Sequence, residues 1–244
     1  MKIRSVIRIA FLAGLTVMAY ACESSWSCLR GNGVAGDEIR TISGFTGVVS
    51  EGEFDVFIIP DSSFSVKLEA DENLIQYIRT SVSGNTLIVD QGTRKCLRSD
   101  NPIRITVYMP QVEYLNLTGS GMITGENIES DVLKVHLTGS GLIDLKGLKT
   151  GLLDALITGS GEMVFWGETL DADLDITGSG MIKAFHLESV NCIANISGSG
   201  SMEIKVKKQL TAYISGSGNI YYQGNPPTVS VNITGSGAVI PANK

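Results

Sequence analysis

The chain has 244 residues, enough for one elongated domain or two small ones. It is acidic, with 25 Asp and Glu residues against 19 Lys and Arg residues, so it offers no basic stripe to the phosphates of a nucleic acid. Its two histidines, His136 and His186, are too few and too scattered for a His-rich metal site.

Residues 1–21 have the pattern of a secretory signal peptide. Three Lys and Arg residues make a basic start, a short apolar run follows, and small residues precede Cys22. This ending resembles a bacterial lipobox, which predicts cleavage before Cys22 and lipid attachment to that cysteine. Tyr20 is unusual in such a motif, so ordinary signal-peptidase cleavage near Ala21 is the alternative.

The signal predicts an exported protein that a lipid anchors to the bacterial outer membrane or the cell surface. Removal of residues 1–21 leaves 16 positive against 25 negative charges, a net charge of −9. Charge would not draw so acidic a chain to an anionic lipid surface, so its contact with the membrane would depend on the lipid anchor.

Residues 22–36 are predicted to form a flexible tether, because they contain several glycines. Export permits disulfides, and Cys28 and Cys96 are the pair we expect, since both lie in polar, loop-like sequence. The alternative is that neither is bonded. No Cys-x-x-Cys or Cys/His spacing indicates a metal site.

Residues 37–110 are predicted to be a β-rich cap region. Strands are expected over residues 54–59, 65–69, 86–89 and 103–107, with a turn at 83–85 and one short helix after Asp71 that has an acidic first turn. A stack of coils needs such a cap, because its end coil otherwise exposes an unpaired edge.

Residues 111–244 are an internal repeat. Seven times a short apolar strand runs into the tetrapeptide Thr/Ser-Gly-Ser-Gly, at steps of 20, 20, 19, 20, 18 and 19 residues. The copies begin at Thr118, Thr138, Thr158, Thr177, Ser197, Ser215 and Thr234. So regular a period is the signature of a stacked repeat architecture.

Side chains alternate around each tetrapeptide. One, three and five residues before it, the positions are almost all apolar, and the positions between them are mostly polar. Past the tetrapeptide, a second strand places Ile123 and its equivalents in an inward column. The prediction is an all-β fold, a parallel β-helix or β-solenoid of about seven coils that rises on the order of 30 Å.

The tetrapeptide is best explained as a corner. Glycine reaches positive φ without a Cβ clash, and stacked corners bring backbones close together. A phosphate-binding loop would need a following helix and a placed lysine, and here a strand follows. A calcium-binding nonapeptide repeat would need an Asp after its glycines, and only Asp144 comes near.

An acidic cluster is the main candidate site. Asp154 and Asp173 both lie four residues before their Thr/Ser, so stacking would place them about 5 Å apart. Asp171 and Asp175 flank Asp173 on the same outward face, with Lys134 in the coil below. The cluster could hold Ca²⁺ or act as a paired acid and base, but a solvated acidic face that discourages sheet aggregation is the favoured interpretation.

Other candidates carry less chemistry. Trp166, Phe185, Tyr213 and Tyr221 lie on or near the outer surface and could stack on sugars, anchor a partner or cover a corner. Cys192 is expected to point inward as an inert thiol. No Ser/His/Asp or Cys/His constellation can be assembled, so we expect no catalytic residue, no metal and no cofactor.

Several segments together resemble one known family. They are residues 42–45, 66–74, 84–89 and 105–110, followed by the Leu-Thr-Gly-Ser-Gly coils. In order and spacing they resemble the "putative auto-transporter adhesin, head GIN domain" family of secreted and lipid-anchored Bacteroidetes proteins, over about residues 39–240. The resemblance implies a parallel β-helix-like fold and an adhesive or surface role, and it supplies no catalytic residues.

The favoured function is therefore that of a non-enzymatic, envelope-anchored β-solenoid that presents one long face to a glycan, a matrix protein or an envelope component. The alternative is a carbohydrate-active β-helix enzyme, a polysaccharide lyase or hydrolase, for which Lys134 near Asp154 and Asp173 is the only suitable grouping. A structural spacer without a ligand is the third interpretation.

Overall fold

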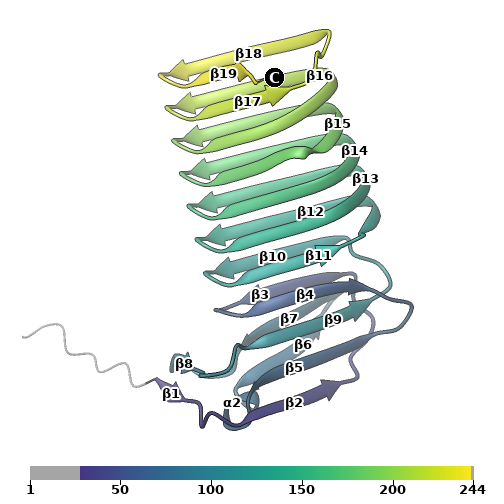
Figure 1. The fold of residues 1–244 in the computed structure, drawn as a ribbon, viewed down its shortest axis with the longest axis vertical. Coiled ribbons are helices and arrows are strands. Elements are labelled where there is room, and N and C mark those ends of the chain that lie inside the picture. The colour runs from purple at the N-terminus through teal and green to yellow at the C-terminus, as the bar shows by residue number, and fades with distance from the viewer. Residues whose placement is uncertain (1–27, 243–244) are drawn as a thin grey trace, which may run out of the picture.

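The computed structural model describes residues 28–242, so the predicted signal peptide and Cys22 lie outside the described residues. The described chain is all-β apart from the four-residue helix α2 (Glu72–Ile75). Figure 1 shows a straight column of stacked coils, with β1, β2 and α2 at one end and β18 and β19 at the other. Among the described residues, no helix has the length and apolar character needed to cross a membrane.

The N-terminal end of the column is a closed cap. Its elements are β1 (Leu29–Arg30), β2 (Ala35–Arg40), β3 (Gly47–Glu51), β4 (Asp55–Pro60), β5 (Ser65–Asp71), α2, β6 (Ile78–Ser83), β7 (Thr86–Gln91), β8 (Leu97–Arg98) and β9 (Arg104–Met109). Strand β5 pairs antiparallel with both β2 and β9, and β6 pairs antiparallel with β7. The predicted strands and the short helix are confirmed.

The repeat region forms the rest of the column. Its strands are β10 (Tyr114–Gly119), β11 (Met122–Glu126), β12 (Glu129–Gly139), β13 (Leu142–Gly159), β14 (Glu162–Gly178), β15 (Met181–Gly198), β16 (Ser201–Gly216), β17 (Asn219–Gln223), β18 (Thr228–Gly235) and β19 (Ala238–Pro241). Each strand pairs in parallel with the equivalent strand of the next coil. The predicted all-β solenoid is therefore confirmed.

The solenoid has about six turns, where the sequence predicted about seven coils. The difference arises because seven corners delimit only six complete turns. Coil-like stacking also reaches below the repeat, because β3 pairs in parallel with β10 and β4 with β11. The sheet therefore runs without a break from the cap into the repeat.

The Gly-Ser-Gly motifs form a stack of tight bends. The first glycine of every motif has a φ between 120° and 131°, a conformation that favours glycine. A Cβ on Gly139 would lie only 2.6 Å from the carbonyl oxygen of Gly119 in the preceding coil. That same oxygen accepts a hydrogen bond of 3.0 Å from the amide of Ser140. The motif is a structural corner, as the sequence indicates.

The core runs along the inside of the column. The aliphatic residues one position before each tetrapeptide are at most 2% exposed from Leu117 to Ile214. Cys192 is buried as expected, and burial, together with the charge of Asp173, raises the pKa of its thiol to about 12. Such a thiol is inert at physiological pH.

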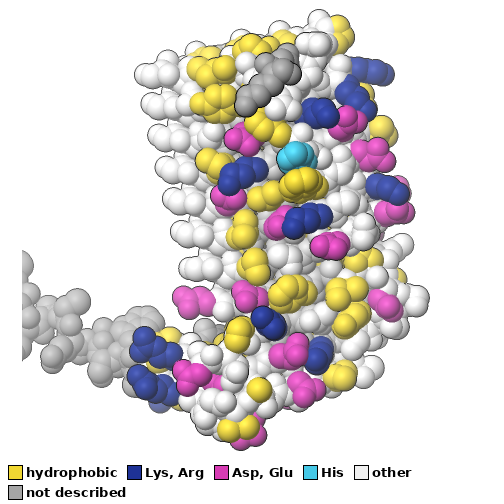
Figure 2. All heavy atoms as spheres, viewed as in Figure 1, with side chains coloured by type: hydrophobic (Ala, Val, Ile, Leu, Met, Phe, Trp, Pro, Cys, Tyr) yellow, Lys and Arg dark blue, Asp and Glu magenta, His cyan; other side chains and the backbone are white. Residues whose placement is uncertain are grey.

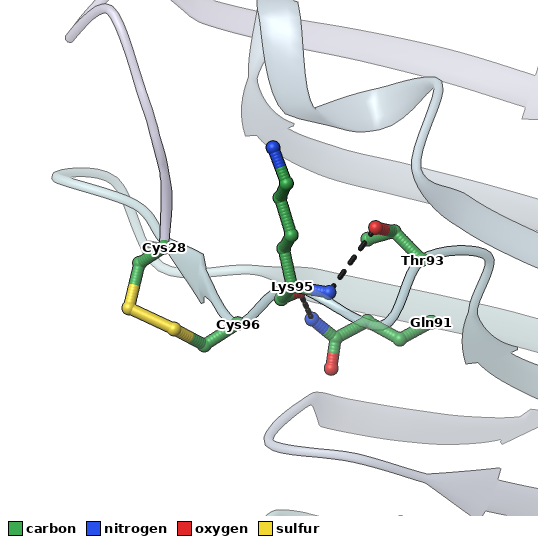
Figure 3. Close-up of a disulfide and its surroundings, with 5 residues drawn as sticks. All are labelled: Cys28, Gln91, Thr93, Lys95 and Cys96. Carbon is green, nitrogen blue, oxygen red and sulfur yellow. Dashed lines mark hydrogen bonds between the residues drawn. A yellow bond between two sulfur atoms is a disulfide. The ribbon is translucent and has the colours of Figure 1, made fainter. Parts of the chain in front are cut away.

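The expected disulfide between Cys28 and Cys96 is present (Figure 3). Beside it, β1 pairs in parallel with β8, and the amide of Leu29 donates to the carbonyl oxygen of Cys96 over 2.8 Å. The flexible tether predicted over residues 22–36 is therefore wrong from Cys28 onward. The disulfide and these hydrogen bonds, which glycine content could not reveal, tie this segment to the cap.

Candidate functional site

A groove of about 1140 Å³ runs along the corner of the column that lies away from the Gly-Ser-Gly bends. It crosses successive coils, from the segment before β10 up to β16. We call it the corner groove. Figure 2 shows Lys and Arg side chains, carboxylates and hydrophobic side chains interspersed over this side of the column, whereas the edge with the bends is mostly free of charge.

Stacking places charged side chains along the rim of the corner groove. Glu129, Lys149, Glu168 and Glu188 are neighbours in register from β12 to β15. The Nζ of Lys149 donates to Oε1 of Glu129 over 3.0 Å. The Nζ of Lys207 lies 2.6 Å from Oε2 of Glu188. The rim is therefore a ladder of ion pairs that bridge neighbouring coils.

These pairs shift the pKa values of their members. Hydrogen bonds from Lys207 and Lys205 lower the pKa of Glu188 to about 2, so this carboxylate stays ionised at any physiological pH. The hydrogen bond to Glu129 raises the pKa of Lys149, and the hydrogen bond to Glu188 raises that of Lys207. Because all three side chains reach solvent, the ion pairs keep these groups charged but add little to the free energy of unfolding.

The floor of the corner groove is apolar. Val132 is 41% exposed and Leu170 is 62% exposed, and Val190 lies beside them. Gly151 of β13 also lines the groove, and a Cβ there would lie 2.7 Å from the carbonyl oxygen of Asp131 in the preceding coil. Exposed aliphatic side chains in a concave, charge-rimmed strip indicate a surface for recognition.

Buried hydroxyl groups support this floor from beneath. Thr150 and Thr169 stack in register, and their Oγ1 atoms are 2.9 Å apart in a hydrogen bond. Thr169 also donates to the carbonyl oxygen of Asp171 over 2.8 Å, and Ser189 donates to that of Lys205 over 2.8 Å. Because each hydroxyl is satisfied inside the corner, the backbone that carries the groove is held in one position.

The acidic cluster lies beside the groove, on the outward face of the neighbouring strands. Lys134, Asp154 and Asp173 are consecutive in register, as the sequence predicts. The Nζ of Lys134 is 3.8 Å from Oδ2 of Asp154. Lys134 lines the corner groove, whereas Asp154 and Asp173 do not.

The ionised form of Asp173 is disfavoured by its surroundings. Partial burial and the charges of Asp175 and Asp154 raise its pKa. Its Oδ1 is buried and has no hydrogen-bond partner among the described residues. Asp171 is in a different position, because it accepts a 2.8 Å hydrogen bond from Nδ2 of Asn191.

The acidic cluster lacks the geometry of a calcium site. Among residues 28–242, no group of three or more His, Cys, Asp or Glu side chains is placed to hold a metal ion. Asp154 and Asp173 point outward from one flat sheet face, and Asp171 is engaged by Asn191. A Ca²⁺ ion needs six to eight oxygen ligands around it, and this arrangement supplies them from one side only.

The outer aromatic residues do not form one platform. Trp166 is 40% exposed and stacks on His186, with ring centroids 3.8 Å apart and planes 10° apart. Equal counting from the corners would place Phe185 opposite Trp166, but a register shift between β14 and β15 brings His186 there instead. Tyr213 is 48% exposed and lines a separate shallow hollow of about 320 Å³.

The corner groove was not predicted from the sequence. Its signal was present, because Glu129, Lys149, Glu168 and Glu188 each stand nine residues before a tetrapeptide. Four charged residues at one repeat position predict a charged ladder once the coils stack. The apolar floor gave no such signal, since Leu170 and Val190 read as ordinary strand residues.

A comparison with family models identifies the family of this chain. The family model described as "Putative auto-transporter adhesin, head GIN domain" matches residues 44–226. The chain belongs to the head GIN domain family. The resemblance seen in the sequence is thereby confirmed, and the match begins in the cap and includes most of the solenoid.

Solved structures of similar proteins share the fold of this head GIN domain. A "putative adhesin" from Bacteroides fragilis is 21% identical, with 88% of this chain and 100% of that chain covered and a TM-score of 0.83. A "putative lipid binding protein" from Parabacteroides distasonis is 25% identical, with 89% and 99% covered and a TM-score of 0.74. A "putative adhesin" from Parabacteroides merdae is 24% identical, with 88% and 98% covered and a TM-score of 0.72.

Comparison with curated proteins finds no match. The descriptions of the head GIN family model and of the two adhesins suggest a surface or extracellular location. The disulfide agrees with such a location, because disulfides persist in oxidising environments outside the cytosol. Neither the family description nor these structures name an enzymatic activity.

Proposed function

We propose that this head GIN protein is a non-enzymatic, envelope-anchored binding protein whose corner groove holds an extended polypeptide segment. The observation that carries the proposal is the corner groove itself, a concave strip with an apolar floor and a charged rim that crosses the coils in line. Two smaller hollows, of about 320 and 620 Å³, lie elsewhere on the column, and neither crosses as many coils.

The dimensions of the groove suit an extended chain. Its rim follows the register from Glu129 through Lys149 and Glu168 to Glu188 and ends at Lys207 in the next coil, which is four steps between coils. At about 4.8 Å per step, this ladder is about 19 Å long, the length of roughly six residues of extended chain. A compact small molecule would use only a fraction of that length.

The chemistry of the lining favours a polypeptide over a glycan. Glycan sites commonly offer aromatic faces for stacking, and Tyr114 is the single aromatic residue in this lining. Aliphatic residues and ion-paired rim groups match the alternating side chains of a peptide strand. The lining holds five carboxylates against three lysines, so we expect a ligand segment with more basic than acidic residues.

A binding array tests this proposal directly. The chain of residues 22–244 with Cys22→Ser, which contains every described residue, would be applied to overlapping peptides from extracellular proteins and, in parallel, to a glycan array. We expect binding to basic, aliphatic peptides that weakens as salt rises. Binding confined to glycans would overturn the choice of ligand, and no binding on either array would overturn the proposed function.

A matched pair of variants locates the binding site. Leu170→Ser removes the most exposed aliphatic side chain of the groove floor and should weaken peptide binding about tenfold, the effect of losing roughly 1.5 kcal/mol of apolar contact. Ile39→Ser is the control, because Ile39 is similarly exposed at 66% but lies on β2 in the cap. Equal effects of the two substitutions would exclude the corner groove as the site.

Lipid attachment at Cys22 is the second part of the proposal. The basic start, the apolar run and the small residues before Cys22 support it, and the disulfide is consistent with export. Metabolic labelling with a fatty-acid probe should mark the wild-type protein and leave Cys22→Ala unlabelled. Equal labelling of both proteins would overturn the anchor.

One observation favours a second candidate function, that of a carbohydrate-active enzyme. Lys134 lies beside Asp154, and the neighbouring Asp173 has a raised pKa, which is the pattern of a base and an acid in a lyase or hydrolase. Polysaccharide turnover that disappears in Asp154→Ala or Asp173→Ala would establish this function. Because the two carboxylates lie outside the groove, we rank it second.

A further inference from the structure

The last coil among the described residues, the open coil formed by β18 and β19, has an unpaired outer edge. Among the described residues, β18 pairs with β16 and β19 pairs with β17, and no strand pairs with their outer edges. Val229, Val231 and Ile233 continue the inward columns of the core, yet they are 41%, 46% and 39% exposed. One coil earlier, the equivalent residues Leu210, Ala212 and Ile214 are at most 2% exposed. The final coil therefore presents the cross-section of the core to solvent.

The two ends of the column differ in how their edges are protected. At the N-terminal end, antiparallel strands, α2 and the disulfide close the stack. At the C-terminal end, β18 has the backbone edge and side chains that invite further strand pairing. Natural edge strands are commonly guarded by lysines or other charges, but no Asp, Glu, Lys or Arg occurs between residues 209 and 243. The outer edge of β18 therefore lacks the charged side chains that would discourage pairing with another strand.

We propose that a second copy of this chain covers the open coil, with the two columns joined end to end about a two-fold axis. In that arrangement, each β18 runs antiparallel to β18 of the partner copy, so the free backbone groups of both edges pair. The exposed aliphatic side chains of one copy meet those of the other. A continued core would then replace the solvent-exposed cross-section.

Charge favours a second copy as the occupant. The chain carries a formal net charge of −6, so two copies repel each other wherever their charged faces meet. The segment without charges forms the end coil, and end-to-end contact keeps the acidic faces of the two columns apart. The open end is therefore the surface through which two acidic copies can associate at the lowest electrostatic cost.

The geometry makes this contact a bridge between two surfaces. The first described residues lie at the cap end of the column and the open coil lies at the far end (Figure 1). A two-fold axis at the open coil places the two caps at opposite ends of the dimer. This step rests on the envelope anchoring proposed above. With an anchor at each cap end, the dimer joins copies on two facing membranes, which is homophilic adhesion.

The contact should be weak for a single pair of molecules. An eight-residue strand is about 26 Å long and stacked sheets lie about 10 Å apart, so the end face covers roughly 260 Å² of each copy, about a third of what one partner contributes to a standard interface. We expect a dissociation constant on the order of 100 µM. Many copies on one membrane would strengthen the contact through multivalency.

Sedimentation equilibrium tests the end-to-end dimer without any membrane. The chain of residues 22–244 with Cys22→Ser should change from monomer to dimer between about 10 µM and 1 mM, and the amides of β18 should gain protection from hydrogen exchange over the same range. A monomer throughout this range would overturn the proposal, whether or not the corner groove binds peptides.

Charged substitutions on β18 identify the interface. Val231→Lys and Val229→Lys each place a cation in the exposed column and should raise the dissociation constant at least tenfold. Ile193→Lys is the matched control, because Ile193 is 45% exposed on β15 and faces outward from the side of the column. Circular dichroism would establish that each variant is folded. A dimer that survives both β18 substitutions would overturn the proposal.

Vesicle clustering tests the bridge. The same chain, attached to nickel-lipid vesicles through an N-terminal His tag, should cluster vesicles, while the Val231→Lys variant should leave them dispersed. The tag replaces the acyl anchor, so failure of Cys22 lipidation does not affect the result. Dimerisation in solution without vesicle clustering would overturn the bridging arrangement.

Discussion

The electrostatic environment of a charged side chain in this protein depends strongly on residues one repeat away. Residues separated by 19 or 20 positions in the sequence become direct neighbours in register, so one charge is felt by the next coil. Glu188 gains two lysine partners and its pKa falls to about 2. Partial burial raises the pKa of Asp173, and the charges of Asp175 in the same strand and of Asp154 in the preceding coil raise it further. Stacking therefore favours the ionised form of Glu188, whereas burial and like charges disfavour that of Asp173.

Replacing Asp173 with Asn should stabilise the protein at neutral pH. Asp173→Asn removes a charge that partial burial and the charges of Asp175 and Asp154 disfavour. We expect the free energy of unfolding to rise by about 0.5 kcal/mol, the scale of a like-charge pair on neighbouring strands. Urea unfolding at pH 7 measures it. Asp171→Asn is the control, because Asp171 accepts a hydrogen bond from Asn191 and should show no gain.

The pH dependence of this gain follows from the direction of the shift. Because the pKa of Asp173 is higher in the folded than in the unfolded state, the native protein binds this proton more readily, and its stability increases as the pH falls through the folded pKa. The advantage of Asp173→Asn should therefore be full above the folded pKa. It should vanish well below the usual value of 3.8, where both states are protonated. An advantage that persists there would contradict the electrostatic origin.

At the scale of elements, the corners set the shape of each coil. The first glycine of a motif combines a positive φ with close contact to the carbonyl oxygen of the coil before it, so two independent constraints exclude a side chain. The second glycine packs against the aliphatic residue of the preceding coil, as Gly161 does against Leu137. The repeated motif is thus explained by the packing of its own copies.

Substitution of a corner glycine should be costly. In Gly178→Ala, the new Cβ would lie 2.5 Å from the carbonyl oxygen of Gly159 at a φ of 122°. We expect a loss of about 2–4 kcal/mol in the free energy of unfolding, from backbone strain together with displacement of the stack. Gly84→Ala is the control, since Gly84 has a φ of 58° with nothing within 4 Å of a Cβ, and should lose only about 1 kcal/mol. Equal losses would show that stacking adds nothing.

The disulfide acts at the scale of the cap. It links residues 68 positions apart and holds β1 against β8. Cys96→Ser should lower the free energy of unfolding by about 2–4 kcal/mol, mainly because the unfolded chain regains the freedom of that loop. Urea unfolding of the variant, compared with wild type under reducing and oxidising conditions, measures the loss. A reduced wild-type protein as stable as the oxidised one would contradict this role.

At the scale of the whole molecule, stability should fall toward the open end. In a stacked repeat, each coil is held by its neighbours, so the last coil has one stabilising interface and the middle coils have two. We expect hydrogen exchange at low protein concentration to be fastest in β18 and β19 and slowest in β13 to β15. The cap should exchange slowly, because antiparallel pairing and the disulfide close it. Uniform protection along the column would show that the protein unfolds as one unit.

Much of the fold could be predicted because a constant period carries three-dimensional information. Counting from the tetrapeptides identified the inward columns and the contact between Asp154 and Asp173. Such counting gave wrong neighbours where the number of residues per coil changes. Glu188 has Lys205 as its register neighbour, 17 residues on, because the corner between β15 and β16 is shortened. Trp166 meets His186 for a similar reason. The corner groove lies at these irregular corners, so periodicity alone could not outline it.

The sequence by itself determined the all-β solenoid, its corners, its core columns and the membership of the head GIN family, because each depends on residues that recur at a constant spacing. Only the tertiary structure decided how the cap closes, how residues 28–36 are held, where the corner groove lies and that the last coil is open. These features depend on antiparallel pairing, a disulfide, local shifts in register and the lack of a following coil among the described residues. None of these features repeats along the chain, so the repeat period does not predict them.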